Sequence, residues 1–331
     1  MIVPVHRPFE QFRFNDQTCF LSGKETSASD KITVFPEWLM RDYRLKDKPF
    51  KLLDESIITY RDIQVPCSPE ILPDINAFDT TIGEAFTAGY SSVKELSEVQ
   101  LFQWIARLVY GIIYHEVRTG MQNKELNIGL ADFSQSLLHK FSNLHLMLQS
   151  LIRPVVFEGV TPWTIAIFPV NNPVDAFIYR DETNTLTFSL TMKDFGIIAC
   201  LQDNNASYMQ HREILEKVKG KPLHPIQFEE LCGRFFYSAY LFNRLPQYTV
   251  LPVDDAIYIE AMPLNSISSK PLFDLWQNKT YAQVLENFWK IWGFTRLEIN
   301  KDPEKPMSFL TDENDQFRPA DTIEAELLKY P

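Results

Sequence analysis

The spacing of apolar residues along the chain constrains its fold more than any other feature of the sequence. Residues 93–120 repeat apolar side chains at helical intervals, and Gly120 closes the repeat with a residue typical of a helix end. Apolar residues also flank this repeat, so we expect one long helix that is buried on several sides. A second helical pattern covers residues 132–152 and stops before Pro154. The stripe of the first helix consists of Leu101, Ile105, Leu108, Ile112 and Val117.

The apolar period changes to two between residues 155 and 202. Short segments rich in β-branched and aromatic residues are separated there by turn signals such as Asn-Asn-Pro. Connections this short predict antiparallel pairing, because parallel strands need longer crossovers. The chain therefore predicts an α+β fold with a helical body and an antiparallel β-meander. Further helices are expected at 206–218, 225–243 and 280–292, and a strand pair at 248–253 and 256–264.

Residues 1–75 differ from the rest of the chain because they are rich in proline and charge. Their short apolar alternations predict short strands, and Pro36 is placed to begin one short helix. We predict a small ββα-like N-terminal region at residues 1–75. The helical and antiparallel-sheet body at residues 76–331 is expected to pack together with it.

Composition and charge limit the classes of partner. The chain has 331 residues, of which 45% are hydrophobic, so it can bury a large core. Its 43 acidic and 32 basic residues give a net charge of -11, which disfavours nucleic acid because phosphates require clustered Lys and Arg. Residues 1–75 contain ten basic and twelve acidic residues, so this region offers no exception.

Cysteine usage and hydropathy predict a cellular location. The N-terminus lacks the cationic start and apolar core of a secretion signal, and no run of about 18 apolar residues could span a bilayer. Four widely spaced cysteines in a chain of this length do not form a disulfide scaffold. We expect a cytoplasmic protein with reduced thiols and no membrane partner.

Three short runs carry a resemblance to a known family. They are Cys19-Phe20-Leu21-Ser22-Gly23-Lys24, residues 32–40 (ITVFPEWLM) and residues 52–70 (LLDESIITYRDIQVPCSPE). Together they resemble a His-Asn-His (HNH) endonuclease module inserted in a zinc knuckle, of the kind carried by bacterial proteins. The resemblance implies a ββα unit, two Cys-x-x-Cys turns around zinc, a catalytic His before the helix and an Asn after the last Cys.

The zinc ligands of such a module are incomplete in this chain. Ser22 and Glu70 stand where the second Cys of each turn is expected, so only Cys19 and Cys67 remain as thiolate ligands. A structural zinc site needs four soft or imidazole ligands, and two thiolates bind zinc far more weakly. We predict no metal and no cofactor.

The catalytic positions are replaced as well. The His that would activate water falls at Thr33, whose hydroxyl does not deprotonate at useful pH. The Asn expected after the last knuckle position is Ile71. We therefore predict that HNH nuclease chemistry is lost and that this region contains no catalytic residue.

The apolar frame of the module persists although its chemistry does not. A structural zinc contributes on the order of 10 kcal/mol or more to a small zinc domain, so a zinc-free unit must depend on the rest of the protein for stability. We expect residues 1–75 to dock onto the helices and to act in a protein-binding or accessory role. The retained frame comprises Phe20, Val34, Phe35, Pro36, Trp38, Leu39, Ile63 and Val65.

Two alternatives stay open from the sequence. One is a hydrolase with a site between the helices and the sheet, built from His115, Glu116 or Asp175. A deep cleft with convergent carboxylates and His would favour it, and a shallow apolar surface would favour a protein partner. The other is residual nucleic-acid binding through a basic cluster that also contains acidic residues. This basic cluster comprises Arg41, Arg44, Lys46, Lys48 and Lys51.

Overall fold

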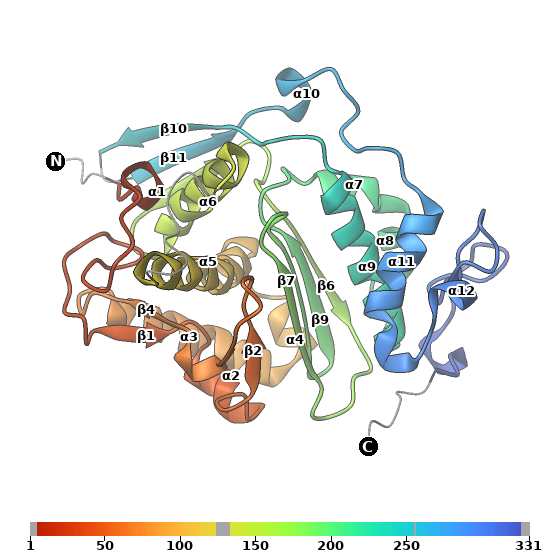
Figure 1. Cartoon of the computed structure of the whole chain (residues 1–331). Helices are drawn as coiled ribbons and strands as arrows, with labels where there is room; N and C mark the ends of the chain where they lie inside the picture. Colours follow the sequence, from red (N-terminus) through yellow and green to blue (C-terminus); the bar gives the residue numbers. More distant parts are fainter. Residues whose placement is uncertain (1–4, 124–132, 255, 326–331) are drawn as a thin grey trace. The chain divides into compact units, whose positions relative to one another are not determined.

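The computed structural model describes residues 5–123, 133–254 and 256–325, and it confirms the α+β class (Figure 1). Its described residues form two compact units. Unit 1 takes them from 1–87, 96–161 and 247–262, and unit 2 from 88–95, 162–246 and 263–331. The predicted boundary at residue 75 stays a prediction, and each unit is described by itself below.

Unit 1 consists of helices and three small sheets. Its sheets are β1 paired with β4, β2 paired with β3, and a three-stranded sheet in the order β10-β11-β5. Its helices are α1 Pro8–Gln11, α2 Glu37–Asp42, α3 Leu72–Ala88, α5 Glu98–Gln122 and α6 Gln135–Leu148, with short 3-10 turns at Tyr60–Asp62 and Gln149–Leu151. Its strands are β1 Lys31–Thr33, β2 Pro49–Lys51, β3 Ile57–Thr59, β4 Gln64–Pro66, β5 Val155–Glu158, β10 Tyr248–Val253 and β11 Ala256–Ala261.

Helix α5 is the central element of unit 1. Ser97 caps its N-terminus by accepting a hydrogen bond from the backbone N–H of Gln100. The side-chain oxygen of Gln100 in turn accepts a hydrogen bond from the backbone N–H of Ser97. The helix is buried on most sides and lies between α6 and the β1–β4 pair (Figure 1). It continues through the buried Gly120 and ends two residues beyond the predicted position. Ser134 caps α6, and residue 132, where that helix was predicted to begin, lies outside the described residues.

Helix α3 was not predicted from the sequence. Its buried residues Ile75, Ile82 and Phe86 are seven and four positions apart, which is a helical spacing. Pro73 lies in its first turn, where proline is tolerated because the N–H is not needed there. Gly83 allows close packing, since a Cβ at this position would lie 3.0 Å from the ring of Trp38 in α2. Trp38 of α2 therefore packs directly on α3 at Gly83.

The three-stranded sheet of unit 1 is mixed. Strands β10 and β11 form the predicted antiparallel pair. Strand β5 lies on the other side of β11 and is parallel to it, with Val156 opposite Tyr258 and Glu158 opposite Glu260. About a hundred residues separate β5 and β11 along the chain, so the short-connection rule did not apply to them.

Unit 2 is built on an antiparallel sheet in the order β6-β9-β8-β7. Strands β7, β8 and β9 form the predicted meander, whereas β6 lies beside β9, which is a Greek-key order. Its strands are β6 Thr164–Pro169, β7 Phe177–Glu182, β8 Thr187–Met192 and β9 Phe195–Cys200. Its helices are α4 Tyr90–Val93, α7 Ala206–Gln210, α8 Arg212–Val218, α9 Pro225–Leu241, α10 Leu264–Ile267, α11 Asn278–Phe288 and α12 Arg296–Ile299, with 3-10 turns at Lys290–Trp292 and Ala320–Thr322.

Helix α9 covers the sheet of unit 2, and α11 packs on the far side of α9 (Figure 1). Gly196 permits the close approach of helix and sheet, because a Cβ there would lie 2.4 Å from the ring of Phe228. Strands β8 and β9 are buried along their whole length. The core of this unit therefore lies between the sheet, α9 and α11.

Candidate functional site

Residues 19–24 form a turn closed by backbone hydrogen bonds. The N–H of Cys19 donates to the carbonyl of Lys24 at 2.9 Å, and the N–H of Gly23 donates to the carbonyl of Cys19 at 3.0 Å. Gly23 has a φ of 71°, a conformation that favours glycine. The N–H of Phe20 donates to the carbonyl of Pro66 at 2.9 Å, which joins this turn to the second.

Cys19 and Cys67 lie together. Both are buried, and their side chains are close enough to influence each other. The Sγ of Cys67 also lies 3.7 Å from the carbonyl oxygen of Ser68. The interaction with Cys67, together with that with Ser22, lowers the pKa of Cys19 to about 5 against the opposing effect of burial. The interaction with Cys19 and burial raise the pKa of Cys67.

Glu70 and Ile71 stand where the resemblance places a Cys and an Asn, and the structure gives each a different environment. The carboxylate of Glu70 forms an exposed ion pair with the ammonium of Lys24, which links the two turns. Ile71 is buried and has no polar side-chain atom. In the part of the chain that the structure describes, no group of three or more His, Cys, Asp or Glu is arranged to hold a metal ion.

Thr33 occupies the position of the expected base. It lies in β1 opposite Gln64 of β4, and its hydroxyl donates to the carbonyl of Phe35 at 2.9 Å. The hydroxyl therefore fixes the turn between β1 and α2.

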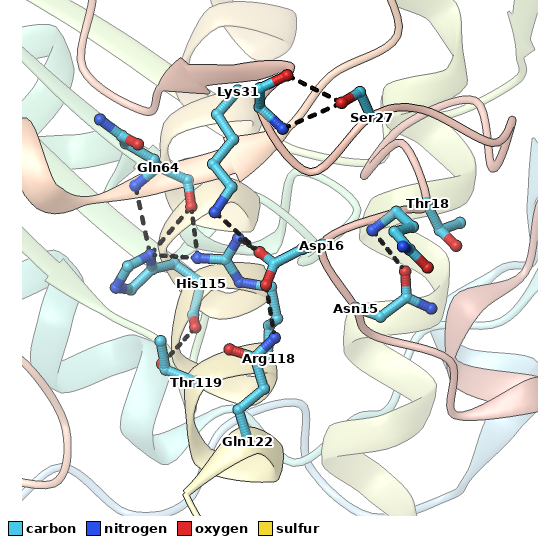
Figure 2. A network of polar contacts seen from close by, with 12 residues as sticks. Asn15, Asp16, Thr18, Ser27, Lys31, Gln64, His115, Arg118, Thr119 and Gln122 are labelled. Carbon is cyan, nitrogen blue, oxygen red and sulfur yellow. Dashed lines mark hydrogen bonds and ion pairs between the residues drawn. The ribbon is translucent and has the colours of Figure 1, made fainter.

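A polar network lies beside Thr33 and joins the N-terminal region to α5 (Figure 2). The carboxylate of Asp16 is 2.7 Å from the guanidinium of Arg118 and 3.0 Å from the ammonium of Lys31, and it accepts a bond from Gln122 at 2.9 Å. Burial raises the pKa of Asp16, but the bonds from Lys31 and Gln122 and the charge of Arg118 outweigh it and lower that pKa. Arg118 also donates to the carbonyl of Gln64 at 3.0 Å.

His115 belongs to the same network (Figure 2). Its Nδ1 is 3.0 Å from the carbonyl oxygen of Gln64 and 3.3 Å from Nη2 of Arg118. Burial lowers the pKa of His115. Glu116, the next residue, instead accepts a hydrogen bond from the N–H of Leu53 at 2.7 Å. Asp175 is exposed and belongs to unit 2, and the hydrolase alternative stays a prediction.

The basic cluster is exposed, as nucleic-acid binding would require. Arg41 pairs with Asp42 at 2.9 Å, and Lys51 pairs with Glu55 at 3.3 Å. Exposed pairs of this kind contribute little free energy and are easily exchanged. The cluster runs from α2 to β2 and contains Arg41, Arg44, Lys46, Lys48 and Lys51.

The sequence analysis did not predict an exposed face on the β10-β11-β5 sheet of unit 1. The inward side of the β10-β11-β5 sheet is buried, and Phe157 packs on Phe102 of α5. The outward side carries Leu251, 58% exposed, in line with Tyr258 and Val156 across the three strands. Strands with one solvated side normally place polar residues on that side. The apolar residues Leu251, Tyr258 and Val156 at outward positions are therefore a signal that the sequence contained. Its hollow of about 260 Å³ is lined by Glu158, Thr249, Leu251, Val253, Tyr258 and Glu260.

A serine–histidine pair was also missed, and it lies in unit 2. Nε2 of His211 is 2.9 Å from Oγ of Ser238, which resembles a nucleophile with its base. Ser238 is fully buried, however, and its hydroxyl donates to the carbonyl of Phe235 at 3.0 Å. Burial lowers the pKa of His211 to about 3, assisted by the charge of Arg234. The pair is therefore a neutral contact within the core.

In the ranges covered by the structure, none of the helices is long and apolar enough to cross a membrane. Comparison with protein-family models, curated proteins and solved structures finds no match to this chain.

Proposed function

We propose that the chain is a non-catalytic protein-binding protein in which residues 19–71 keep the shape of an HNH module without its metal or base. The observation that carries this proposal is the shallow hollow on the outer face of the β10-β11-β5 sheet, where Leu251, Val253 and Tyr258 lie beside two carboxylates. An exposed apolar surface of this kind suits the docking of another protein, whereas acid-base catalysis needs ionisable groups that converge in a cleft. A cytoplasmic location is part of the proposal and rests on cysteine usage.

The local bonds of the altered HNH positions support the loss of chemistry. Glu70 is paired with Lys24, and the hydroxyl of Thr33 is bonded to Phe35. Each side chain thus has a structural role that requires neither a metal ion nor a substrate.

Two carboxylates at the hollow specify the chemistry of the partner. Glu158 and Glu260 lie opposite each other on neighbouring strands, and both line the hollow. Within the described ranges, neither carboxylate forms an ion pair with a Lys, Arg or His side chain. Their mutual repulsion would be relieved by a cation. We infer a partner segment that places a Lys or Arg between the two carboxylates and apolar side chains on Leu251 and Tyr258.

A second copy of this chain is the weaker candidate for the occupant. The chain carries a net charge of -11, and a symmetric pairing of the two faces would bring Glu158 and Glu260 near their own copies. A basic segment of another protein meets the same surface with charges of opposite sign.

Selection of peptides tests the binding surface. A displayed random library is selected on the full-length protein, and the peptides obtained are synthesised and titrated by calorimetry. We expect apolar sequences that contain Lys or Arg, with affinity at least about tenfold weaker, or about 1.4 kcal/mol, for Leu251→Asp and for Glu158→Gln combined with Glu260→Gln. Val174→Asp is the matched control, because Val174 is 88% exposed and lies in unit 2. Peptides that are acidic, or that bind Leu251→Asp as tightly as the wild type, would contradict the assigned surface.

A nuclease assay tests the absence of catalysis separately. Plasmid DNA is incubated with the wild type in Mg²⁺, Mn²⁺ or Zn²⁺, and we expect no nicking above that of the buffer. Cleavage that disappears in Thr33→Ala would overturn the non-catalytic proposal while leaving the peptide result intact.

Residual nucleic-acid binding is the second candidate function, because the basic cluster is exposed. Fluorescence anisotropy of a labelled duplex should show at most weak binding at low salt that vanishes near 0.15 M, where charges are screened beyond about 8 Å. Binding that persists at this salt and is lost in Lys46→Glu combined with Lys48→Glu would favour the nucleic-acid function.

A further inference from the structure

The knuckle turns hold a second feature that a protein-binding role does not use, namely the thiols of Cys19 and Cys67. Both residues are almost fully buried, at 0% and 2% exposure, and they lie on adjacent segments, because the N–H of Phe20 donates to the carbonyl of Pro66 at 2.9 Å. They are separated by 47 intervening residues in the sequence, so the fold alone brings them together.

The backbone holds the two thiols in place from both sides. The turn at Cys19 is closed by its bond to Lys24, and Phe20 donates to Pro66, the residue before Cys67. The N–H of Cys67 donates to the carbonyl of Asp30 at 2.9 Å. These bonds fix the backbone of both cysteines, so the two side chains start from neighbouring positions of the fold.

We propose that Cys19 and Cys67 form an oxidative modification site in which a hydroperoxide converts the two thiols into an intramolecular disulfide. This inference is independent of the proposed protein-binding function.

The reaction requires one molecule of hydrogen peroxide. The sulfur of one of the two cysteines attacks a peroxide oxygen, the O–O bond breaks, and a sulfenic acid and one water are formed. The sulfur of the other cysteine then attacks the sulfenic sulfur, its proton leaves with the hydroxide as a second water, and the S–S bond forms. The two thiols lose two electrons and two protons, and the peroxide is reduced to two waters.

Either cysteine can take the first step, because both thiols are buried side by side and each is the neighbour that resolves the other. The other two cysteines provide matched controls. Cys200 contacts Thr187 and Ser207, and Cys232 contacts Ser189, so hydroxyls and not thiols are their neighbours. Burial raises the pKa of both Cys200 and Cys232, so their thiols stay protonated. Their hydroxyl neighbours cannot resolve a sulfenic acid into a disulfide.

Peptide mapping of the full-length protein tests the proposal. The protein is reduced, freed of reductant, treated with hydrogen peroxide and blocked with N-ethylmaleimide under denaturing conditions. Trypsin then releases Cys19 in residues 14–24 and Cys67 in residues 62–94. We expect these two peptides to be joined, to separate with dithiothreitol, and to form about tenfold or more faster than label is lost at Cys200 or Cys232.

Variants make the result specific. Cys19→Ala and Cys67→Ala should each abolish the joined peptide, whereas Cys200→Ser and Cys232→Ser should retain it, with circular dichroism confirming that each variant is folded. Because the wild type is mapped directly, the test stands even where a variant fails to fold. Full labelling of Cys19 and Cys67 after peroxide treatment, a bond to Cys200 or Cys232, or a bond between two chains would overturn the proposal. Zinc bound in a 1:1 ratio that blocks the reaction would overturn it as well.

Discussion

Gly111 of α5 leaves room for Val34, the residue that follows β1 in the HNH-like frame. A Cβ on Gly111 would lie 2.8 Å from Cγ2 of Val34 and 2.9 Å from Cγ1. Val34 is buried and β-branched, so its methyl groups have little freedom to move. Helix and frame can therefore reach this distance only because residue 111 has no side chain.

This contact predicts the effect of Gly111→Ala. Alanine favours a helix interior by about 1 kcal/mol over glycine, but overpacking costs about 1–3 kcal/mol. We expect the free energy of unfolding, measured by urea denaturation, to fall by about 1 kcal/mol. In a Val34→Ala background the steric cost disappears, and the same change should stabilise the protein by up to about 1 kcal/mol. A loss of equal size in both backgrounds would mean that Val34 is not the cause.

The second prediction concerns two added cysteines that would complete a zinc site. Ser22→Cys and Glu70→Cys together recreate two Cys-x-x-Cys turns around Cys19 and Cys67, and we expect the double variant to bind one zinc ion per chain. Native mass spectrometry and metal quantification of protein purified with zinc measure the ratio. The wild type should contain far less than one equivalent, and a full equivalent in the wild type would refute the metal-free interpretation.

Arg244 is expected to be a strong determinant of stability in unit 2. Its five N–H groups donate to five backbone carbonyls, of Asn243, Leu264, Ser268, Lys270 and Pro271. Hydrogen bonds to a charged group contribute roughly 1.5–3 kcal/mol each, and they are not additive. Arg244→Ala should therefore lower the free energy of unfolding by about 3 kcal/mol or more.

Local hydrogen exchange distinguishes this mechanism from a general loss of stability. Exchange in residues 264–271 should accelerate in Arg244→Ala before it does in β8 or β9. Arg244→Lys should recover only part of the loss, because an ammonium has three donors and lacks the planar fork. Full recovery with lysine would show that charge alone is sufficient.

The buried His211 predicts a pH dependence of stability. Its pKa is about 3 in the folded protein and close to 6.5 when unfolded, so the unfolded chain binds the extra proton between these values. Stability should be unaffected by this residue above pH 7 and should fall as the pH drops below about 6.5. At pH 5 the difference is 1.5 pH units, or roughly 2 kcal/mol.

Comparison of His211→Gln with the wild type at pH 7 and pH 5 isolates this effect. The variant should gain about 2 kcal/mol relative to the wild type on going to pH 5. Asp203 gives a control of opposite sign, because burial raises its pKa to about 6 and the folded state takes up the proton first as the pH falls. Asp203→Asn should therefore lose stability relative to the wild type between pH 7 and pH 5. An unchanged difference in both variants would contradict these pKa shifts.

The sequence alone determined the elements whose signals are local. The buried repeat of Leu101, Ile105 and Leu108 set α5, because a helix places such residues on one side regardless of its partners. Short turns between β7, β8 and β9 fixed their antiparallel pairing. The residue types Ser22 and Glu70 predict the loss of a zinc site, and this stays a prediction.

Only the tertiary structure decided which distant residues meet. Pairing of β5 with β11 and the outer face around Leu251 join segments far apart in the sequence. Residue spacing gives no information about such pairs, since they depend on how complete elements pack and which faces remain uncovered. The candidate binding face therefore emerged from packing, whereas strands β10 and β11 that form most of it were encoded by local patterns.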